Sequence, residues 1–133
     1  ISYYKLSGTG VTNKRTPVTT QGPQNVVNPP EGYPGVEWDS VSERIVGWVG
    51  GTTIYSLNPS TLVWTAIPAS TANTVNPGAP TRHGSNGRWR YVANHDCYII
   101  VNSINTNAFL YRPDRGTSGV TLQVAASVGV TVQ

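Results

Sequence analysis

The segment from Thr81 to Tyr91 gathers the residue types most able to bind a ligand. It holds three arginines, a histidine and a tryptophan among glycines, namely Arg82, His83, Arg88, Trp89 and Arg90. An arginine beside an aromatic ring can hold an anionic or sugar ligand by forked hydrogen bonds and stacking. Trp38, flanked by two acidic residues, could offer a sugar a similar platform. The alternative is that Trp89 packs inside the fold while the arginines extend over it.

The sequence carries no catalytic motif. His95-Asp96 could form an acid–base pair, but its position favours a polar turn between strands. We find no serine–histidine–aspartate order with a nucleophile turn, no metal-ligand spacing and no phosphate-cradling glycine loop. The single cysteine, Cys97, precedes an apolar run and is expected to be a buried thiol. We therefore expect a protein that is not an enzyme and that uses no cofactor and no metal.

Composition limits the possible partners and compartments. The 133 residues predict one domain, and charged residues make up 11%, far below the usual quarter. A net charge of +3 is too small to indicate nucleic-acid binding, and no apolar run is long enough to predict a membrane span. Charge-poor, threonine- and asparagine-rich β chains are typical of extracellular or particle-surface proteins. Methionine is absent, so we expect a processed product or a segment of a longer chain.

The elements that must position these residues repeat at an interval of about 53 residues. Trp38 and Tyr91 occupy equivalent positions one repeat apart, and so do Glu43 and Asp96. After a one-residue slip, Pro59 falls on Pro113. A period near 50 in an all-β sequence predicts four-stranded antiparallel meanders, stacked so that each shares its buried face with a neighbour.

The repeat divides residues 1–118 into three units, about 1–34, 35–87 and 88–118, followed by an uncharged β-strand tail at 119–133. In the second unit the alternation of apolar residues and the turn signals predict four strands, Val36–Asp39, Arg44–Val49, Thr53–Leu57 and Leu62–Ile67. In the third unit they predict Arg88–Val92, Cys97–Asn102, Asn107–Tyr111 and a weaker strand near Val120–Val124. A last strand is expected at Val128–Val132.

The second unit resembles a kelch repeat of the galactose-oxidase-like β-propellers. The features that carry the resemblance are a strand ending in Gly50-Gly51, an aromatic strand with Tyr55, a turn at Asn58-Pro59, and Trp64 opening the last strand. In such a repeat Trp64 wedges between neighbouring sheets, and Trp48 is expected in the core as well. The other two copies are degraded, because Asn102-Ser103 replaces the glycines and Val11 replaces the tryptophan.

The resemblance implies about two and a half blades of a propeller that needs four to eight. We therefore expect the ring to be incomplete, or to be completed by other blades of the same chain or by other subunits. The function we expect is a non-enzymatic binding or scaffold module at a cell or particle surface, with a glycan or protein ligand. The alternative is a structural subunit that self-assembles by donating its tail as a strand.

Overall fold

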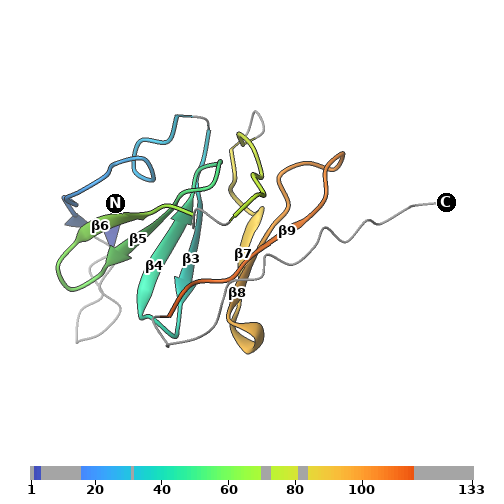
Figure 1. The fold of residues 1–133 in the computed structure, drawn as a ribbon. Helices are drawn as coiled ribbons and strands as arrows, with labels where there is room; N and C mark the ends of the chain where they lie inside the picture. Colours follow the sequence, from blue (N-terminus) through green and yellow to red (C-terminus); the bar gives the residue numbers. More distant parts are fainter. Residues whose placement is uncertain (1, 4–15, 31, 70–72, 81–83, 116–133) are drawn as a thin grey trace.

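The computed structural model describes residues 2–3, 16–30, 32–69, 73–80 and 84–115, and in these residues the protein is all-β (Figure 1). The first pair of short strands is β1 (Ser2–Tyr3) and β2 (Thr16–Pro17). The first large sheet consists of β3 (Gly35–Asp39), β4 (Arg44–Trp48), β5 (Ile54–Asn58) and β6 (Val63–Ile67). The second consists of β7 (Trp89–Val92), β8 (Cys97–Ile100) and β9 (Phe109–Tyr111), with a single 3₁₀ turn, η1 (Ala93–His95), between β7 and β8.

The first sheet is the antiparallel meander that the sequence predicts, with its strands in the order β3-β4-β5-β6. Its turns follow from local chemistry. Gly50 and Gly51, between β4 and β5, adopt φ values of 105° and 68°, which side chains other than glycine rarely adopt. Asn58 closes the turn from β5 to β6, because its side-chain oxygen accepts a hydrogen bond from the Ser60 amide at 2.9 Å.

The second sheet repeats the register of the first. Trp38 pairs with Ile45 in the first hairpin, and Tyr91 pairs with Tyr98 at the corresponding place in the second. The turns of both hairpins also end at an acidic residue with positive φ, Glu43 at 52° and Asp96 at 43°. The repeat is therefore a structural one. The predicted strands Val120–Val124 and Val128–Val132 and the tail 119–133 lie outside the described residues.

The one-residue slip in the sequence repeat also has a structural counterpart. Ile45 pairs with Leu57 across β4 and β5, whereas the equivalent Tyr98 pairs with Tyr111 across β8 and β9. The connection in the second sheet is therefore one residue longer. The loop takes up the extra residue, so Tyr111 pairs with Tyr98 as Leu57 pairs with Ile45, and the side chains of β9 keep their facing. Pro113 is therefore displaced by one residue without turning the apolar side of β9 outward.

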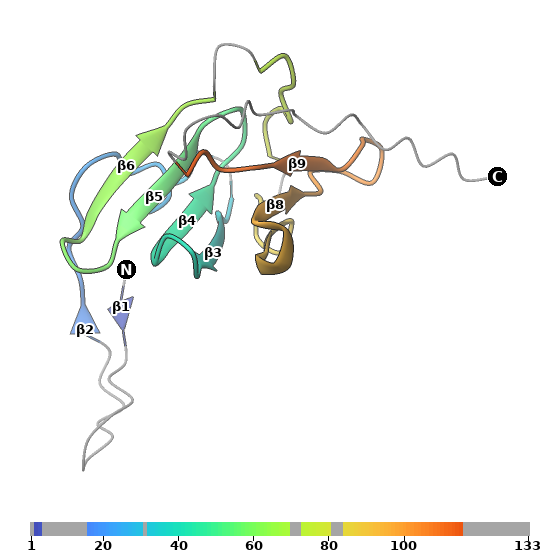
Figure 2. The same ribbon diagram turned by 60° about the horizontal axis from the view of Figure 1, so that its bottom comes forward.

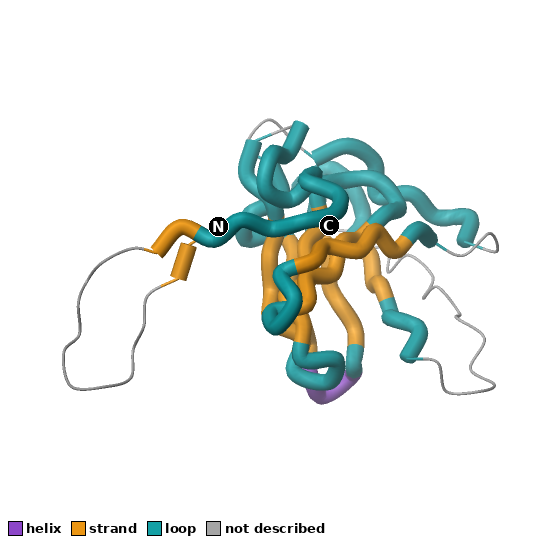
Figure 3. The backbone as a smooth tube through the Cα atoms, turned by 90° about the vertical axis from the view of Figure 1, so that its left-hand side faces the viewer, coloured by secondary structure: helices purple, strands orange, loops and turns teal. Residues whose placement is uncertain are grey.

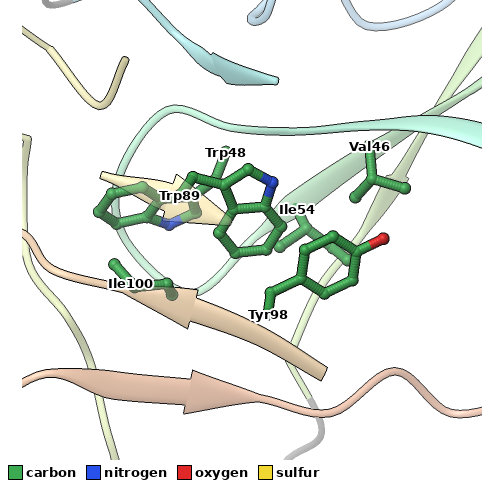
Figure 4. Close-up of a cluster of buried hydrophobic side chains, with 6 residues drawn as sticks. All are labelled: Val46, Trp48, Ile54, Trp89, Tyr98 and Ile100. Carbon is green, nitrogen blue, oxygen red and sulfur yellow. The ribbon is translucent and has the colours of Figure 1, made fainter. Parts of the chain in front are cut away.

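The two large sheets pack face to face and share one core. Its buried members are Val46, Trp48, Ile54, Trp89, Tyr98 and Ile100 (Figure 4). Trp89 lies between two rings, with centroid distances of 6.3 Å to Trp48 and 4.3 Å to Tyr98. Both contacts are stacked, so the aromatic rings add a directional term to the burial of apolar area. Trp48 is 1% exposed, as the sequence predicts.

The opposite side of the first sheet is covered by the chain that precedes it. Val26 packs there with Trp64, Tyr55 and Leu57 in a second cluster. Trp64 is 1% exposed, which confirms that it is buried. The sequence predicted that Trp64 would wedge between two sheets. In the structure it packs instead against the segment around Val26, which lies in the place expected for another sheet.

The edge strands β3 and β7 lie against each other (Figure 1). In Figure 2, β4, β5 and β6 extend from β3 to one side, and β8 and β9 lie on the other. Ser85 connects the sheets at this edge. Its hydroxyl donates to the Trp48 carbonyl at 2.6 Å and accepts from the Gly35 amide at 2.8 Å, and the residue is fully buried. Figure 3 shows the turn that contains η1 at one end of the strands, with longer loops at the other end. The site described next lies toward the η1 end.

Candidate functional site

A cleft of about 750 Å³ opens between the two sheets, next to their shared core. The first sheet provides one wall with side chains of β4, β5 and β6 and with the turn from β3 to β4. The second sheet provides the other wall with β8, β9 and the residues that follow β9. Described residues that line the cleft include Asp39, Ser56, Thr65, Ile67, Tyr98, Tyr111, Pro113 and Arg115.

Asp39 is the central polar residue of this cleft. It ends β3 and is 1% exposed. One carboxylate oxygen accepts hydrogen bonds from the amides of Val41 and Ser42 at 3.0 and 3.1 Å, which fixes the turn into β4. The other oxygen accepts from the Tyr98 hydroxyl at 2.8 Å and pairs with the Arg115 guanidinium at 2.8 Å. One buried carboxylate thus joins the first sheet to the second.

Arg115 extends this network to a second carboxylate. Its Nε donates to one oxygen of Asp96 at 3.0 Å while a terminal nitrogen donates to the other, so the pair is bidentate. The Tyr91 hydroxyl donates to Asp96 at 2.9 Å. The guanidinium side chain is 21% exposed. Arg115 therefore bridges the end of β3 and the turn between β7 and β8.

The contacts of this network lower the pKa values of its carboxyl groups and raise that of the Tyr91 hydroxyl. Burial by itself raises the pKa of Asp39, but the hydrogen bonds from Ser42, Tyr98 and Arg115 outweigh it and lower the pKa to about 2. The bond from Arg115 lowers the pKa of Asp96. Burial, together with the bond to Asp96, raises the pKa of Tyr91 to about 12. At neutral pH both carboxylates are therefore ionised and Tyr91 keeps its proton.

The rest of the cleft offers weaker and more varied contacts. The Tyr111 ring, Ile67 and Pro113 form apolar surface, and Ser56 and Thr65 add hydroxyl groups. Hydroxyl groups both donate and accept hydrogen bonds. A ring-shaped ligand with an apolar face and several hydroxyl groups would meet matching chemistry on both walls.

The structure disperses the residues that the sequence singled out as ligand-binding candidates. Arg82 and His83 lie outside the described residues. Arg88 is half-buried and donates to the Asn102 carbonyl at 2.9 Å. Arg90 is exposed and forms an ion pair with Glu37 at 2.8 Å. These two arginines therefore each have a partner within the protein.

The two candidate tryptophans lie in different places. Trp89 is 1% exposed and stacked in the core. It therefore packs inside the fold, as the alternative interpretation of the sequence has it, and has no surface to offer a ligand. Trp38 is 49% exposed. It points to the side of β3 away from the second sheet, because Glu37 beside it faces Arg90 across the sheet junction. Trp38 and the arginines therefore do not form one site.

Sequence reasoning missed the residues that form the cleft network. Asp39 had a local signal, since an aspartate at the start of a sequence such as Asp39-Ser40-Val41-Ser42 is a typical turn residue whose side chain bonds to the following amides. Arg115 had none, because it lies far along the chain from both of its partners. His95-Asp96 does form the predicted polar turn, as η1 ends at His95 and Asp96 caps it. That Asp96 also pairs with Arg115 becomes visible only in the fold.

No protein-family model, no curated protein and no solved structure matches this chain. Within the described ranges, no group of three or more histidine, cysteine, aspartate or glutamate side chains is placed to hold a metal ion. The same part of the chain contains no helix with the length and hydrophobicity needed to cross a membrane. The fold class that the structure establishes is all-β with antiparallel sheets.

Proposed function

We propose that the protein is a non-enzymatic binding module, built as part of a kelch-like β-propeller at a cell or particle surface, and that the cleft between its sheets binds a glycan. The observation that carries this proposal is the composition of the cleft walls. The Tyr111 ring and Pro113 line the wall formed by the second sheet, and the hydroxyl groups of Ser56 and Thr65, with Ile67, line the wall formed by the first, around a volume of about 750 Å³. Ligand pockets of proteins typically measure about 300–1,000 Å³, and a sugar unit needs an apolar platform with hydroxyl partners.

The network at Asp39 supports a binding role over a catalytic one. Each acidic group in it already accepts several hydrogen bonds, and the pKa values of Asp39 and Asp96 are lowered. A general acid or base at neutral pH works best with a pKa near 7. The network therefore supplies hydrogen-bonded carboxylates, two for one guanidinium, at the floor of the cleft, and not a proton donor.

Filling the cleft tests the proposal. Thr65 lies on β6 with an exposed side chain that lines the cleft, so Thr65→Trp should fill the space without disturbing the core. The control is Thr61→Trp, which places the same ring on the exposed turn between β5 and β6. On an array of neutral and acidic glycans, we expect the wild-type chain and Thr61→Trp to bind the same sugars and Thr65→Trp to lose them, with equal melting temperatures.

A second variant distinguishes the cleft from the arginine cluster. Arg88→Ala with Arg90→Ala should leave glycan binding unchanged if the cleft is the site. Loss of binding in this double variant, with binding kept by Thr65→Trp, would assign the ligand to the arginines. A wild-type chain that binds no glycan on the array would reject the proposal as a whole.

The alternative function, a self-assembling structural subunit, has one observation in its favour. Among the described strands, β9 has a partner on one side only, whereas its counterpart β5 lies between β4 and β6. A strand edge without a partner among the described strands is the kind of edge to which another chain can add a strand. If the tail 119–133 of a neighbouring subunit adds to this edge, deletion of 119–133 should convert a multimer to monomers that melt at a similar temperature.

A further inference from the structure

The two sheets meet through faces that can be matched position by position. From the second sheet, Trp89 and Tyr91 of β7 point toward the first sheet and belong to the shared core. The common register of the two hairpins makes Val36 and Trp38 of β3 their counterparts in the first sheet. Val36 and Trp38 are 44% and 49% exposed. We call the surface they form the leading face.

The second sheet has the complementary surface. From the first sheet, Val46 and Trp48 of β4 point toward the second sheet and are buried there. Their counterparts in register are Ile99 and Val101. Val101 is 44% exposed, and Leu110, which pairs with Ile99 across β8 and β9, is 39% exposed. We call the surface of Ile99, Val101 and Leu110 the trailing face.

The charges at the sheet junction repeat in the same way. Glu37 of the first sheet pairs with Arg90 of the second, and the two residues lie 53 positions apart, at equivalent places in their hairpins. If the trailing face of one molecule met the leading face of another, Arg90 of the first would lie beside Glu37 of the second. The same pair of opposite charges would thus form between molecules. Arg90 is 68% exposed and keeps donors for a second carboxylate.

We propose that the leading and trailing faces are complementary and that a second copy of this chain docks on them head to tail, with β3 of one copy against the second sheet of the other. Such a contact is heterologous, because different surfaces of the two molecules meet. The segment around Val26 covers β4, β5 and β6 on this side of the first sheet, so the contact between molecules is confined to Val36 and Trp38 of the edge strand β3. The proposal requires neither the glycan site nor the tail.

Blocking each face separately tests the proposal. Trp38→Lys places a charge on the leading face and Val101→Lys places one on the trailing face. By sedimentation equilibrium of the full chain, we expect the wild type to associate as its concentration rises and each variant alone to associate much more weakly. An equimolar mixture of the two variants should form a dimer, because each variant keeps the one intact face that the other needs. Ile104→Lys, at a side chain 98% exposed, is the control and should associate like the wild type.

Several results would overturn the proposal. One is a wild-type chain that stays monomeric over the accessible concentration range. Another is association that both single variants abolish and that mixing does not restore, because this pattern indicates a symmetric interface. A third is association that persists in both variants and disappears when 119–133 is deleted, which would assign it to the tail.

Discussion

Asp39 offers the sharpest test of what holds the two sheets together. Its pKa is lowered from an ordinary 3.8 to about 2. One pKa unit corresponds to about 1.4 kcal/mol, so the ionised carboxylate stabilises the fold by about 2–3 kcal/mol relative to the protonated one. We expect Asp39→Asn to lose about this amount at pH 7. The amide oxygen can still accept from Val41 and Ser42, and Arg115 keeps Asp96, so the loss is confined to the charge at one position.

The sign of the pH dependence follows from the direction of the pKa change. A carboxyl group with a lowered folded pKa contributes its full stability above the unfolded pKa of about 4, and loses it as the pH falls toward 2. At pH 3 roughly half of this stabilisation should be gone. Urea unfolding of wild type and Asp39→Asn at pH 7, 5, 4 and 3 measures the difference directly. The two curves should converge as the pH falls, and a constant difference would refute an electrostatic role and leave only a change in packing.

Substitutions at three further positions test the packing on the two sides of the first sheet by chemical denaturation. Trp64→Ala should cost about 3–5 kcal/mol, as truncation of a buried aromatic does, while Trp64→Phe should cost less because the indole nitrogen has no partner among the described residues. Gly35→Ala should cost about 3 kcal/mol, since the added carbon would lie 2.5 Å from Cβ of Trp89 and 2.9 Å from the Ser85 carbonyl. Ser85→Ala should cost about 1–3 kcal/mol because two buried backbone groups lose their partner. An unchanged unfolding midpoint for Trp64→Ala would contradict its burial against Val26, and one for Gly35→Ala or Ser85→Ala would place that residue outside the sheet junction.

The elements of the fold could be predicted because their signals are local. Alternating apolar residues mark the strands, and Gly50-Gly51 and Asn58-Pro59 mark the turns between them. The repeat interval then sets the register of β7 and β8, because two hairpins of the same length and pattern pair in the same way. Strand ends differ from the prediction by one or two residues, as at β9, which begins at Phe109 and not at Asn107.

The contacts between elements could not be predicted, because they depend on how the sheets pack. The cleft network joins residues from three separated parts of the chain, Asp39, Asp96 and Arg115. The inward direction of the Trp89 side chain, in contrast, could have been predicted from the sequence. Trp89 and Tyr91 alternate with Arg90 along β7, so period-two alternation alone places the aromatic rings on one face and the charge on the other.

The network at Asp39 also makes the sheet contact inside the molecule different from the one proposed between molecules. The counterpart of Asp39 in the second sheet is Val92, which pairs with Cys97 as Asp39 pairs with Arg44. Val92 has no carboxylate, so it cannot bind a guanidinium or a tyrosine hydroxyl of an incoming sheet.

A contact on the trailing face would therefore combine apolar packing with one exposed ion pair, and exposed pairs contribute about 0–1 kcal/mol. The contact within the molecule adds a buried carboxylate with four hydrogen-bond partners. Head-to-tail association should therefore be reversible and depend on concentration, while the sheet pair that encloses the cleft stays together.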